Sequence, residues 1–327
     1  MRSKRMKDYA VVIGGLNIDI AGLSGAELRL RDSNPGSVRI SIGGVGQNIA
    51  RNLAMLGVQT SLISVCGDDS FGRLALADCE EAGIDCSQVT VIPGEASSTY
   101  LYINNANGDL VTAVNDMHIT EHITGALLEP KLPFINGASM VVLDANLQEE
   151  TIAWIAEHVT APLAADTVSV AKAQRLRPVL SKLYILKPNE LEAAVLAGIT
   201  PAGGESDVSV EEAQAAARRL NDLGVRKVFV SMGAQGLLYS SEKEQGIEPS
   251  LADASQIVST NGAGDCAMAA ILKASLEQGA DGLMQEAAAL SQAAAAINMQ
   301  AAEAFAKDLS WEAVLRRREK AAAHTKE

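Results

Sequence analysis

Four residues near the carboxyl-terminal end of the chain, Gly262-Ala263-Gly264-Asp265, combine types that suit phosphate chemistry. Small residues let the backbone turn sharply, and the apolar stretch that follows, residues 266–272, predicts a buried helix. The N–H groups at a helix N-terminus carry partial positive charge and bind phosphate. A carboxylate at Asp265 would then accept a proton from a hydroxyl group that attacks phosphorus. The alternative is a glycine turn in which Asp265 only caps the helix.

A second glycine segment, Gly43-Gly44-Val45-Gly46-Gln47-Asn48, starts another predicted helix, because the apolar residues after it repeat at helical spacing. Asn48 lies near the N-terminus of that helix, where a polar side chain reaches a bound ligand. Upstream, the apolar run at residues 10–13 predicts a strand, and Asn17 and Asp19 follow it. Side chains at the carboxyl ends of strands line the ligand-binding edge of α/β sheets.

These three segments, in this order, resemble those of the PfkB/ribokinase family of small-molecule kinases. In that family an early strand ends in an Asn-x-Asp pair, Gly-Gly-x-Gly-x-Asn starts a helix, and a late Gly-Ala-Gly-Asp holds the catalytic base. The resemblance covers nearly the whole chain, roughly residues 9 to 300. It implies a kinase that uses ATP and Mg²⁺, with Asp265 as the base. The backbone N–H groups of Gly262, Ala263 and Gly264 would form the anion cradle.

Two further segments match the nucleotide side of this family's site. Lys187-Pro188-Asn189-Glu190-Leu191-Glu192 resembles a Pro-Asn-x-x-Glu segment that serves phosphate and Mg²⁺, and residues 230–236 resemble the nucleotide-side loop. Each of these assignments has an alternative. Asn189 and Glu192 could be an N-cap followed by a solvated glutamate, residues 230–236 could be a plain strand–turn–strand, and Asn298 could be an exposed helical asparagine. The resemblance assigns ATP to Asn189, Ser231, Gly233, Gly236 and Asn298, and Mg²⁺ to Glu192.

The resemblance also assigns a site for the acceptor molecule. Asp19 is expected to accept hydrogen bonds from ribose hydroxyl groups, although an Asp at a strand end is often only a turn former. Asn146 follows the apolar run at residues 140–143 and belongs to the same edge of the sheet. Lys172 and Thr99 are expected base or lid contacts, or else ordinary surface or strand residues. The expected acceptor residues are Asn17, Asp19, Gly43, Gly44, Asn48, Asn146, Thr99 and Lys172.

Within the family, shorter segments resemble the pseudouridine kinase subgroup. They include Ala113-Val114-Asn115-Asp116-Met117, and Asp166-Thr167-Val168-Ser169 with Lys172. This resemblance implies phosphorylation of the 5′-hydroxyl group of pseudouridine. Ribose, another nucleoside or a ketose stays open as the acceptor, and so does a regulator that binds a ligand without catalysis. A dinucleotide oxidoreductase using Gly44-Val45-Gly46 is disfavoured, because the third glycine of that fingerprint would fall at Ile49.

Composition and motifs argue against several other classes of protein. The net charge of -13 at pH 7 argues against binding to nucleic acid or to a membrane surface, which need basic patches. The four cysteines show no Cys-x-x-Cys pairing, which predicts reduced thiols in a cytoplasmic protein. His118 and His122 could share a helix face, but no nearby carboxylate or Cys pattern completes a metal site. The motifs of P-loop kinases and protein kinases do not occur.

Apolar runs alternate along the chain with amphipathic stretches, which predicts a ribokinase-like, doubly wound α/β fold with a mostly parallel sheet. The runs lack a period of two, as strands buried on both faces do. The expected strands include 10–13, 62–65, 140–143, 184–186 and 228–230, and the expected helices include 49–56, 71–82, 147–158, 211–223 and 283–297.

Two segments alternate instead with a period of two, at residues 37–42 and 99–114. As the family resemblance implies, they are assigned to a small β-lid built from about 18–42 and 97–116. The alternative is that they extend the edge of the main sheet. Apolar side chains on both sides of a lid strand indicate that the chain forms a homodimer through the lid.

The whole of residues 8–320 is expected to form a single kinase domain that carries this lid. Residues 1–7 and 321–327 are expected to be disordered ends, and 203–207 an exposed loop.

One position departs from the family pattern. Many relatives carry Asp-Thr-x-Gly-Ala-Gly-Asp, whose first Asp helps to hold the acceptor and a monovalent cation, whereas Ser259 stands here. A hydroxyl in place of a carboxylate removes a full negative charge. Ala301-Ala302-Glu303 also stands where a glycine-containing turn is usual. We therefore expect a monovalent cation such as K⁺ to bind weakly.

Overall fold

The computed structural model describes residues 9–202, 208–279 and 282–324 of the 327-residue chain. Two expectations fall outside these residues, namely disorder at 1–7 and the exposed loop at 203–207. At the other end, helix α11 (Trp311–His324) continues past residue 320. The expectation of disorder is therefore wrong for residues 321–324, and 325–327 lie outside the described part.

Within the described residues, the main sheet contains β1 (Tyr9–Ile13), β4 (Gln59–Ile63), β9 (Met140–Asp144), β10 (Leu163–Asp166), β11 (Leu183–Lys187), β12 (Lys227–Ser231), β13 (Leu237–Ser240) and β14 (Gln245–Glu248). The strand order is β14-β13-β12-β11-β10-β9-β1-β4. Neighbouring strands from β12 to β4 run parallel, and β13 and β14 add an antiparallel hairpin at one edge. The predicted mostly parallel sheet is confirmed.

Both faces of the main sheet are covered, which explains why its strands are apolar without alternation. Successive side chains of a strand point to opposite faces. In β1, Ala10 and Val12 pack into one hydrophobic core, and Val11 and Ile13 pack into the other.

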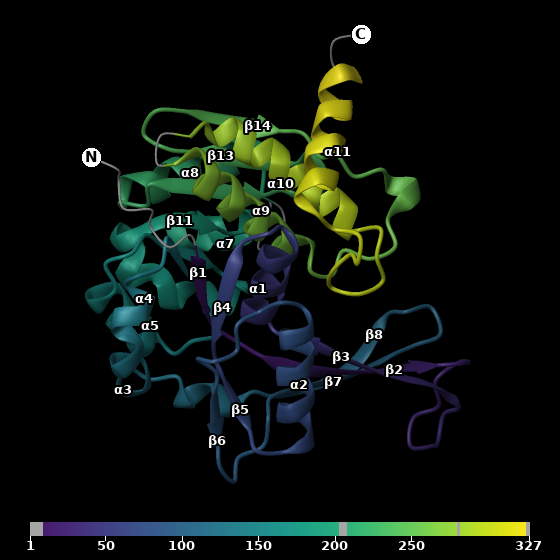
Figure 1. The fold of residues 1–327 in the computed structure, drawn as a ribbon. Coiled ribbons are helices and arrows are strands. Elements are labelled where there is room, and N and C mark those ends of the chain that lie inside the picture. Colours follow the sequence, from purple (N-terminus) through teal and green to yellow (C-terminus); the bar gives the residue numbers. More distant parts are fainter. Residues whose placement is uncertain (1–8, 203–207, 280–281, 325–327) are drawn as a thin grey trace.

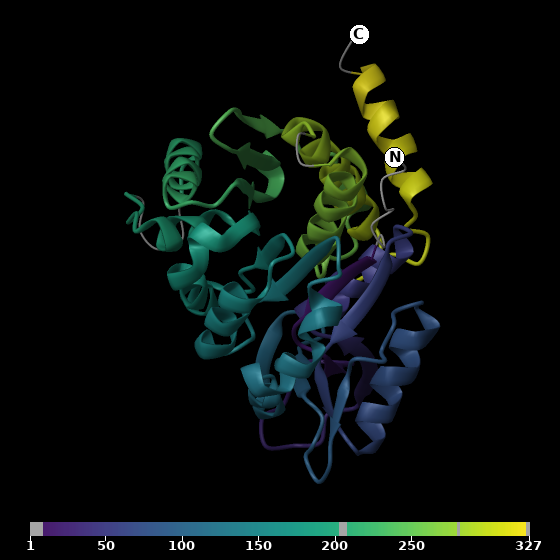
Figure 2. The same ribbon diagram turned by 60° about the vertical axis from the view of Figure 1, so that its left-hand side comes forward.

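The helices divide between these two cores. The first core receives α1 (Val45–Met55), α2 (Ser70–Glu81), α9 (Ala263–Gln278), α10 (Met284–Asn298) and α11, and the second receives α3 (Gly125–Leu128), α4 (Leu132–Ile135), α5 (Glu149–His158), α6 (Val170–Ala173), α7 (Glu190–Ala197) and α8 (Val210–Asp222). Figures 1 and 2 show the two groups on either side of the sheet. The five predicted helices correspond to α1, α2, α5, α8 and α10. Among the described helices, we find none whose length and apolar character would let it span a bilayer.

The lid is a separate sheet made of β2 (Asn17–Ser24), β3 (Gly36–Gly43), β7 (Thr99–Asn104) and β8 (Leu110–Asp116). Its order is β3-β2-β7-β8, and it is not an extension of the main sheet. Figure 1 shows these strands extending away from the body of the molecule. The two segments with a period of two therefore lie in the lid as predicted.

The predicted strand at residues 62–65 is divided between two sheets. β4 ends at Ile63, and Val65 begins β5 (Val65–Gly67), which pairs with β6 (Thr90–Ile92). Between them, the Ser64 hydroxyl donates a hydrogen bond to the carbonyl oxygen of Gly14. The chain thus leaves the main sheet at Ser64, and an apolar run alone does not reveal this change of pairing.

Candidate active site

The last residues of three neighbouring strands lie side by side at the carboxyl edge of the main sheet. Asp144 ends β9, Asp166 ends β10 and Lys187 ends β11, and the register pairs Asp166 with both of the others. Their exposed fractions are only 0%, 5% and 6%, respectively. The Nζ atom of Lys187 lies 3.1 Å from Oδ2 of Asp166. Buried charge of this kind needs partners, and here it lies where α/β sheets bind ligands.

The carboxylate of Asp144 joins the two early glycine segments. Its Oδ2 accepts hydrogen bonds from the backbone N–H groups of Gly15 (2.8 Å) and Gly46 (2.7 Å), and its Oδ1 accepts one from Asn146 (2.9 Å). Burial raises the pKa of Asp144, and these N–H donors oppose the rise because they favour the ionised form. A Cβ at Gly14 would overlap this carboxylate. Asp144 therefore fixes the start of α1 against the end of β1.

The turn at Gly44 brings the early segments to the late Asp265. Gly44 has a φ of 99°, and a Cβ there would lie 2.5 Å from the carbonyl oxygen of Gly15, so glycine is required. The same Cβ position lies 2.9 Å from Oδ1 of Asn17. In the first turn of α1, the Asn48 side chain donates a hydrogen bond of 2.8 Å to Oδ2 of Asp265.

Asp19 lies where β2 leaves the body and enters the lid. The Asn17 side chain donates a hydrogen bond of 2.6 Å to Asp19. Burial raises the pKa of Asp19 to about 6 despite this bond. A Cβ at Gly43 would overlap the Asp19 carboxylate. The three residues form one cluster, whose carboxylate oxygens are suited to accept hydrogen bonds from hydroxyl groups.

The start of α9 has the geometry expected of an anion cradle. Gly262 is the N-cap with a φ of 72°, and a Cβ there would overlap the carbonyl oxygen of Ala304. The first N–H groups of a helix have no partner within the helix; here the helix begins at Ala263, whose N–H donates a long hydrogen bond of 3.3 Å to the carbonyl oxygen of Thr260 before the helix. Gly264 is exposed, so the space in front of these groups is open.

Asp265 is half-buried in the first turn of α9. Burial, and next the charge of Asp166, raise its pKa to about 7. The hydrogen bond from Asn48 and the charge of Lys187 oppose this rise. A carboxylate with this pKa is a stronger base near neutral pH than an ordinary Asp.

Asn146 and Lys172, both predicted acceptor residues, contact each other. The Nζ atom of Lys172 donates a hydrogen bond of 2.6 Å to Oδ1 of Asn146. Burial lowers the pKa of Lys172, Asp144 opposes this effect, and Arg175 adds to it. The two side chains therefore lie at the same edge of the sheet as Asp144.

The structure does not bring Thr99 to Asp19. In the register of β2 and β7, Asp19 pairs with Tyr100, and Thr99 pairs with Ile18. Because successive strand residues point to opposite faces, the Thr99 side chain lies on the lid face away from Asp19. Tyr100 and Tyr102 lie on the Asp19 face instead, with ring centroids 5.3 Å apart.

Asn189 and Glu192 form a capping box at the start of α7. Asn189 accepts a hydrogen bond of 2.8 Å from the N–H of Glu192, and Glu192 Oε2 accepts one from the N–H of Asn189 (2.9 Å) and one from the Thr167 hydroxyl. Glu192 is only 6% exposed, so the N-cap alternative is confirmed but its solvated glutamate is wrong. Ser231, at the end of β12, forms a parallel bridge with Asn189. The two segments assigned to the nucleotide side are therefore neighbours.

Gly233 and Gly236 lie in a tight turn between β12 and β13, which is the strand–turn–strand alternative, and the space beside Gly233 is open. Asn298 is fully buried at the end of α10, so the exposed asparagine of the alternative is wrong. Its amide donates to the carbonyl oxygen of Asn261 and accepts from the N–H of Ala306, both at 3.1 Å. Asn298 therefore connects the residue before the cradle, Asn261, to Ala306, and its amide is not at the surface.

Sequence reasoning did not single out Asp144 or Lys187 as site residues, and it used Tyr100 and Tyr102 only as apolar surface of the lid. Asp144 could have been noticed as the charged residue that ends an apolar run, and Lys187 as the cation that opens a quoted motif. The two tyrosines carry no such signal, because their place beside Asp19 depends on the register between β2 and β7.

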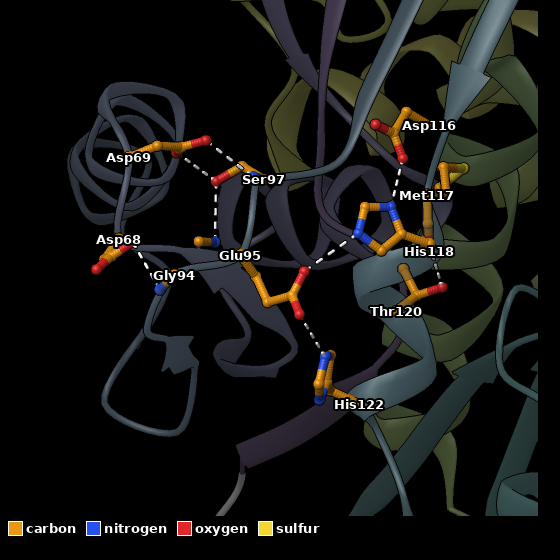
Figure 3. Close-up of polar contacts among 11 residues, drawn as sticks. Asp68, Asp69, Gly94, Glu95, Ser97, Asp116, Met117, His118, Thr120 and His122 are labelled. Carbon is orange, nitrogen blue, oxygen red and sulfur yellow. Dashed lines mark hydrogen bonds and ion pairs between the residues drawn. The ribbon is translucent and has the colours of Figure 1, made fainter.

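A second polar cluster lies where the lid meets the body (Figure 3). The His118 ring lies between Oδ1 of Asp116 (2.5 Å) and Oε2 of Glu95 (3.2 Å), and His122 lies 3.6 Å from Oε1 of Glu95. The fold thus supplies a carboxylate that the sequence did not place beside the histidines. Across the described ranges, no group of three potential ligands is arranged to hold a metal ion. The cluster instead ties the end of β8 to the segment before β7.

Known proteins resemble this chain in fold and in sequence. The family model "pfkB family carbohydrate kinase" matches residues 7–309. A pseudouridine kinase of Escherichia coli K12 is 37% identical, covering 82% of this chain and 83% of its own length. An uncharacterized sugar kinase of the same organism, YeiI, is 34% identical, covering 83% and 73%, respectively. The structure of Arabidopsis thaliana ribokinase complexed with ribose and ATP matches with a TM-score of 0.82 at 21% identity, covering 96% of this chain and 99% of that one.

Proposed function

This chain belongs to the PfkB family of carbohydrate kinases, and we propose that it transfers the γ-phosphoryl group of ATP to the 5′-hydroxyl group of a ribonucleoside, with pseudouridine as the preferred acceptor. The observation that carries this proposal is the hydrogen bond from Asn48 to Asp265. It joins α1, which begins directly after Gly43 and Gly44 of the expected acceptor site, to α9, which carries the cradle and the base. The cytoplasmic location expected from the cysteine spacing stays a prediction.

Asp265 acts as the general base in this proposal. The acceptor hydroxyl oxygen attacks the γ-phosphorus, the bond between phosphorus and the ADP oxygen breaks, and the hydroxyl proton goes to Asp265. In a loose transition state this proton leaves late, so a carboxylate is basic enough. The N–H groups at Gly262, Ala263 and Gly264 stabilise the charge on the transferred group.

The residues beside the cradle fit Mg²⁺ and the ATP phosphates. Mg²⁺ in nucleotide sites keeps several waters and takes one or two carboxylates together with substrate phosphates. Glu192 is a buried carboxylate whose Oε2 is fixed by the capping box. It would hold the ion, and Asn189 and Ser231 would lie along the phosphates. When bound, Mg²⁺ neutralises charge on the phosphates.

A ribonucleoside acceptor accounts for two features of the lid, the Asp19 cluster and the pair of tyrosines beside it. The cluster of Asp19, Asn17 and Gly43 would accept hydrogen bonds from ribose hydroxyl groups. Tyr100 and Tyr102 lie on the same lid face as Asp19, and stacking on an aromatic ring contributes about 1–3 kcal/mol per base. The 37% identity to a pseudouridine kinase supports pseudouridine within this class.

Two alternatives stay open for the acceptor and for catalysis. A kinase for a sugar or another nucleoside is supported by the 34% identical relative that is named a sugar kinase. A regulator that binds its ligand without catalysis is the more distant alternative. The presence of Asp265 beside the small-residue cradle speaks against it, because binding alone needs no base at that position.

Incubation of the protein with ATP and Mg²⁺ and one of pseudouridine, uridine, adenosine, ribose or fructose tests the proposal. ADP release is measured, and kcat/KM is expected to be highest for pseudouridine. Comparable turnover of adenosine, ribose or fructose would refute the pseudouridine assignment and leave the kinase activity standing. No ADP release with any acceptor would favour the regulator.

We also propose that the chain forms a homodimer through the lid. Ile40, Leu101 and Val114 are 49%, 41% and 62% exposed and lie in one cross-strand row with Ile20, on the face away from Asp19. Exposed apolar rows on sheets tend to be covered by another surface. Light scattering should give twice the monomer mass of 34.2 kDa, and Ile40→Glu should shift the protein to monomer.

A further inference from the structure

Arg51 is a buried cation in α1 that lies outside the site described so far. Its side chain is only 8% exposed, and its guanidinium group contacts both the carboxylate and the backbone carbonyl oxygen of Asp78 on α2. On another side, its Cζ atom lies 4.4 Å from the centroid of the Phe305 ring. Buried ion pairs contribute little net stability, because the desolvation penalty offsets the attraction. The pair with Asp78 therefore does not by itself account for a buried arginine here.

The phenylalanine in this contact belongs to a loop, residues 299–306, that connects α10 to α11 and packs against the cradle. At one end of the loop, the carbonyl oxygen of Met299 accepts a hydrogen bond of 2.8 Å from the N–H of Val258, in the segment that leads into the cradle. Near its other end, the carbonyl oxygen of Ala304 lies where a Cβ of Gly262 would be. The position of this loop therefore determines where the start of α9 lies.

One turn of α1 contacts both the base and this loop. Asn48 and Arg51 are three residues apart, so they lie on the same face of the helix. Asn48 donates its hydrogen bond to Asp265, and Arg51 lies over the Phe305 ring. The base and the loop that packs against the cradle thus have a common support in α1.

We propose that Arg51 is a positioning residue for phosphoryl transfer, a role that rests on the proposed kinase function. Arginine stacks on aromatic rings through its planar guanidinium group, and such contacts are stronger when they are shielded from water. By holding Phe305, Arg51 keeps the loop against Gly262 and so fixes the cradle N–H groups relative to Asp265. In this role Arg51 neither contacts a substrate nor moves a proton. Transfer depends on such distances, because a displacement of about 1 Å can lower the rate by about 10²-fold.

Three single variants separate the ring contact from the ion pair. Phe305→Leu removes the ring and keeps a large apolar side chain, and Arg51→Met removes the cation. Asp78→Asn is the matched control, because it removes the ion pair and leaves the cation over the ring. At saturating ATP and acceptor, kcat should fall roughly 10- to 100-fold in the first two variants and change less than about twofold in the control. Phe305→Tyr keeps the ring and should keep kcat near that of the wild type.

Two further readouts distinguish positioning from a general loss of stability. The double variant Arg51→Met/Phe305→Leu should have the kcat of its slower parent, because both changes remove the same contact. The pH at which kcat/KM rises should stay the same, because the charges that shift the pKa of Asp265 are those of Asp166, Lys187 and Asp144. Thermal unfolding gives the stability of each variant separately.

Hydrogen exchange tests the same role without any acceptor. Exchange of the backbone N–H groups at residues 258–265 should become faster in Phe305→Leu and Arg51→Met but not in Asp78→Asn, because only the first two release the loop. Should Arg51→Met not fold, Phe305→Leu is compared with Phe305→Tyr by the same measurements.

Unchanged kcat and unchanged exchange in Phe305→Leu would overturn the proposal. So would a fall in kcat of Asp78→Asn as large as that of Arg51→Met, because the ion pair and not the ring would then carry the effect. A wild-type protein that releases no ADP with any acceptor would instead refute the proposed kinase function. Hydrogen exchange would in that case still show whether Arg51 holds the cradle.

Discussion

The carboxyl edge of the main sheet buries charged side chains, whereas the lid exposes apolar ones. At the sheet edge, charged side chains are buried and held by backbone N–H groups or by one another, as Asp144 and Asp166 are. On the outer face of the lid, large apolar side chains face solvent, and Val38 is 74% exposed. Charged contacts at the base of the lid, such as those of His118, are exposed.

This difference indicates that the sheet edge determines the rate of phosphoryl transfer and that the lid determines how tightly the acceptor binds. Buried groups with several hydrogen bonds keep their positions, so the transfer centre is organised before substrates bind. The lid contributes Asp19 to the proposed acceptor site, and its contacts at His118 are exposed. Variants at the sheet edge should therefore lower kcat for every acceptor, and variants in the lid should change how tightly acceptors bind.

The largest effect is expected from Asp265→Asn. Loss of a positioned general base lowers kcat by roughly 10²–10⁴, and ATP binding should stay nearly unchanged because the cradle N–H groups remain. Steady-state kinetics and calorimetry measure the two quantities. Glu312→Gln, an exposed change on α11, is the control. Activity of Asp265→Asn within a few-fold of the wild type would remove Asp265 from the mechanism. It would also contradict the expectation that variants at the sheet edge lower kcat.

The pH dependence of kcat/KM should report the same residue. Asp265 works as a base only when ionised, and its pKa is raised to about 7. The rate should therefore rise with pH through about 7 and level off above it. A rate that is already maximal near pH 5 would show that Asp265 titrates as an ordinary carboxyl group.

The fold was predictable because its signals are local and repeated. Unbroken apolar runs such as residues 10–13 and 140–143 gave the parallel strands, and a period of two gave the lid. The divided run at 62–65 was not predictable, because the division follows from the pairing of Val65 with Thr90 in a different sheet, which the local sequence does not show. Disorder was expected from residue 321, and the charged sequence at the end of the chain gave no sign that helix α11 continues to His324.

The site was predictable where glycine segments mark it. Gly44 and Gly262 have positive φ and lie against the carbonyl oxygens of Gly15 and Ala304, so no other residue type fits at either position. The row of Asp144, Asp166 and Lys187 could not be assembled from the sequence, because only the order of the strands brings their ends together. For Thr99, the alternation of a lid strand decided the face, and an assignment one residue along would have reached Tyr100.

In the lid, Asp19→Ala should weaken every ribose-bearing acceptor alike. It removes hydrogen bonds to hydroxyl groups that these acceptors share, and an unpaired polar contact costs about 1–3 kcal/mol, so kcat/KM should fall at least about tenfold. The ratio of pseudouridine to uridine turnover should not change, because the two acceptors carry the same ribose hydroxyl groups. A loss confined to one acceptor would show that the cluster of Asp19, Asn17 and Gly43 contacts the base and not the shared ribose.

A smaller effect is expected from K⁺, near the cradle itself. Ser259 has no charge to attract a cation, and its Oγ accepts a hydrogen bond from the N–H of Asn261. Titration of KCl against NaCl at fixed ionic strength should show only modest activation, below about tenfold, and Ser259→Asp should increase it because a full charge is restored. A K⁺-specific stimulation of tenfold or more in the wild type would show that backbone carbonyls alone build the site.

The smallest effect concerns His118 at the base of the lid. Hydrogen bonds to Asp116, and then to Glu95, raise the pKa of His118 above its ordinary value of 6.5. The stabilisation from this charged contact is fully present below the unfolded pKa and is lost as pH rises through the higher folded pKa. Because exposed ion pairs are weak, His118→Gln should lower the unfolding temperature only slightly at pH 6 and not at all at pH 9. His158→Gln, at an exposed histidine of α5, is the control. A His118→Gln difference that is the same at both pH values would mean that the ring holds the lid by packing and not by charge.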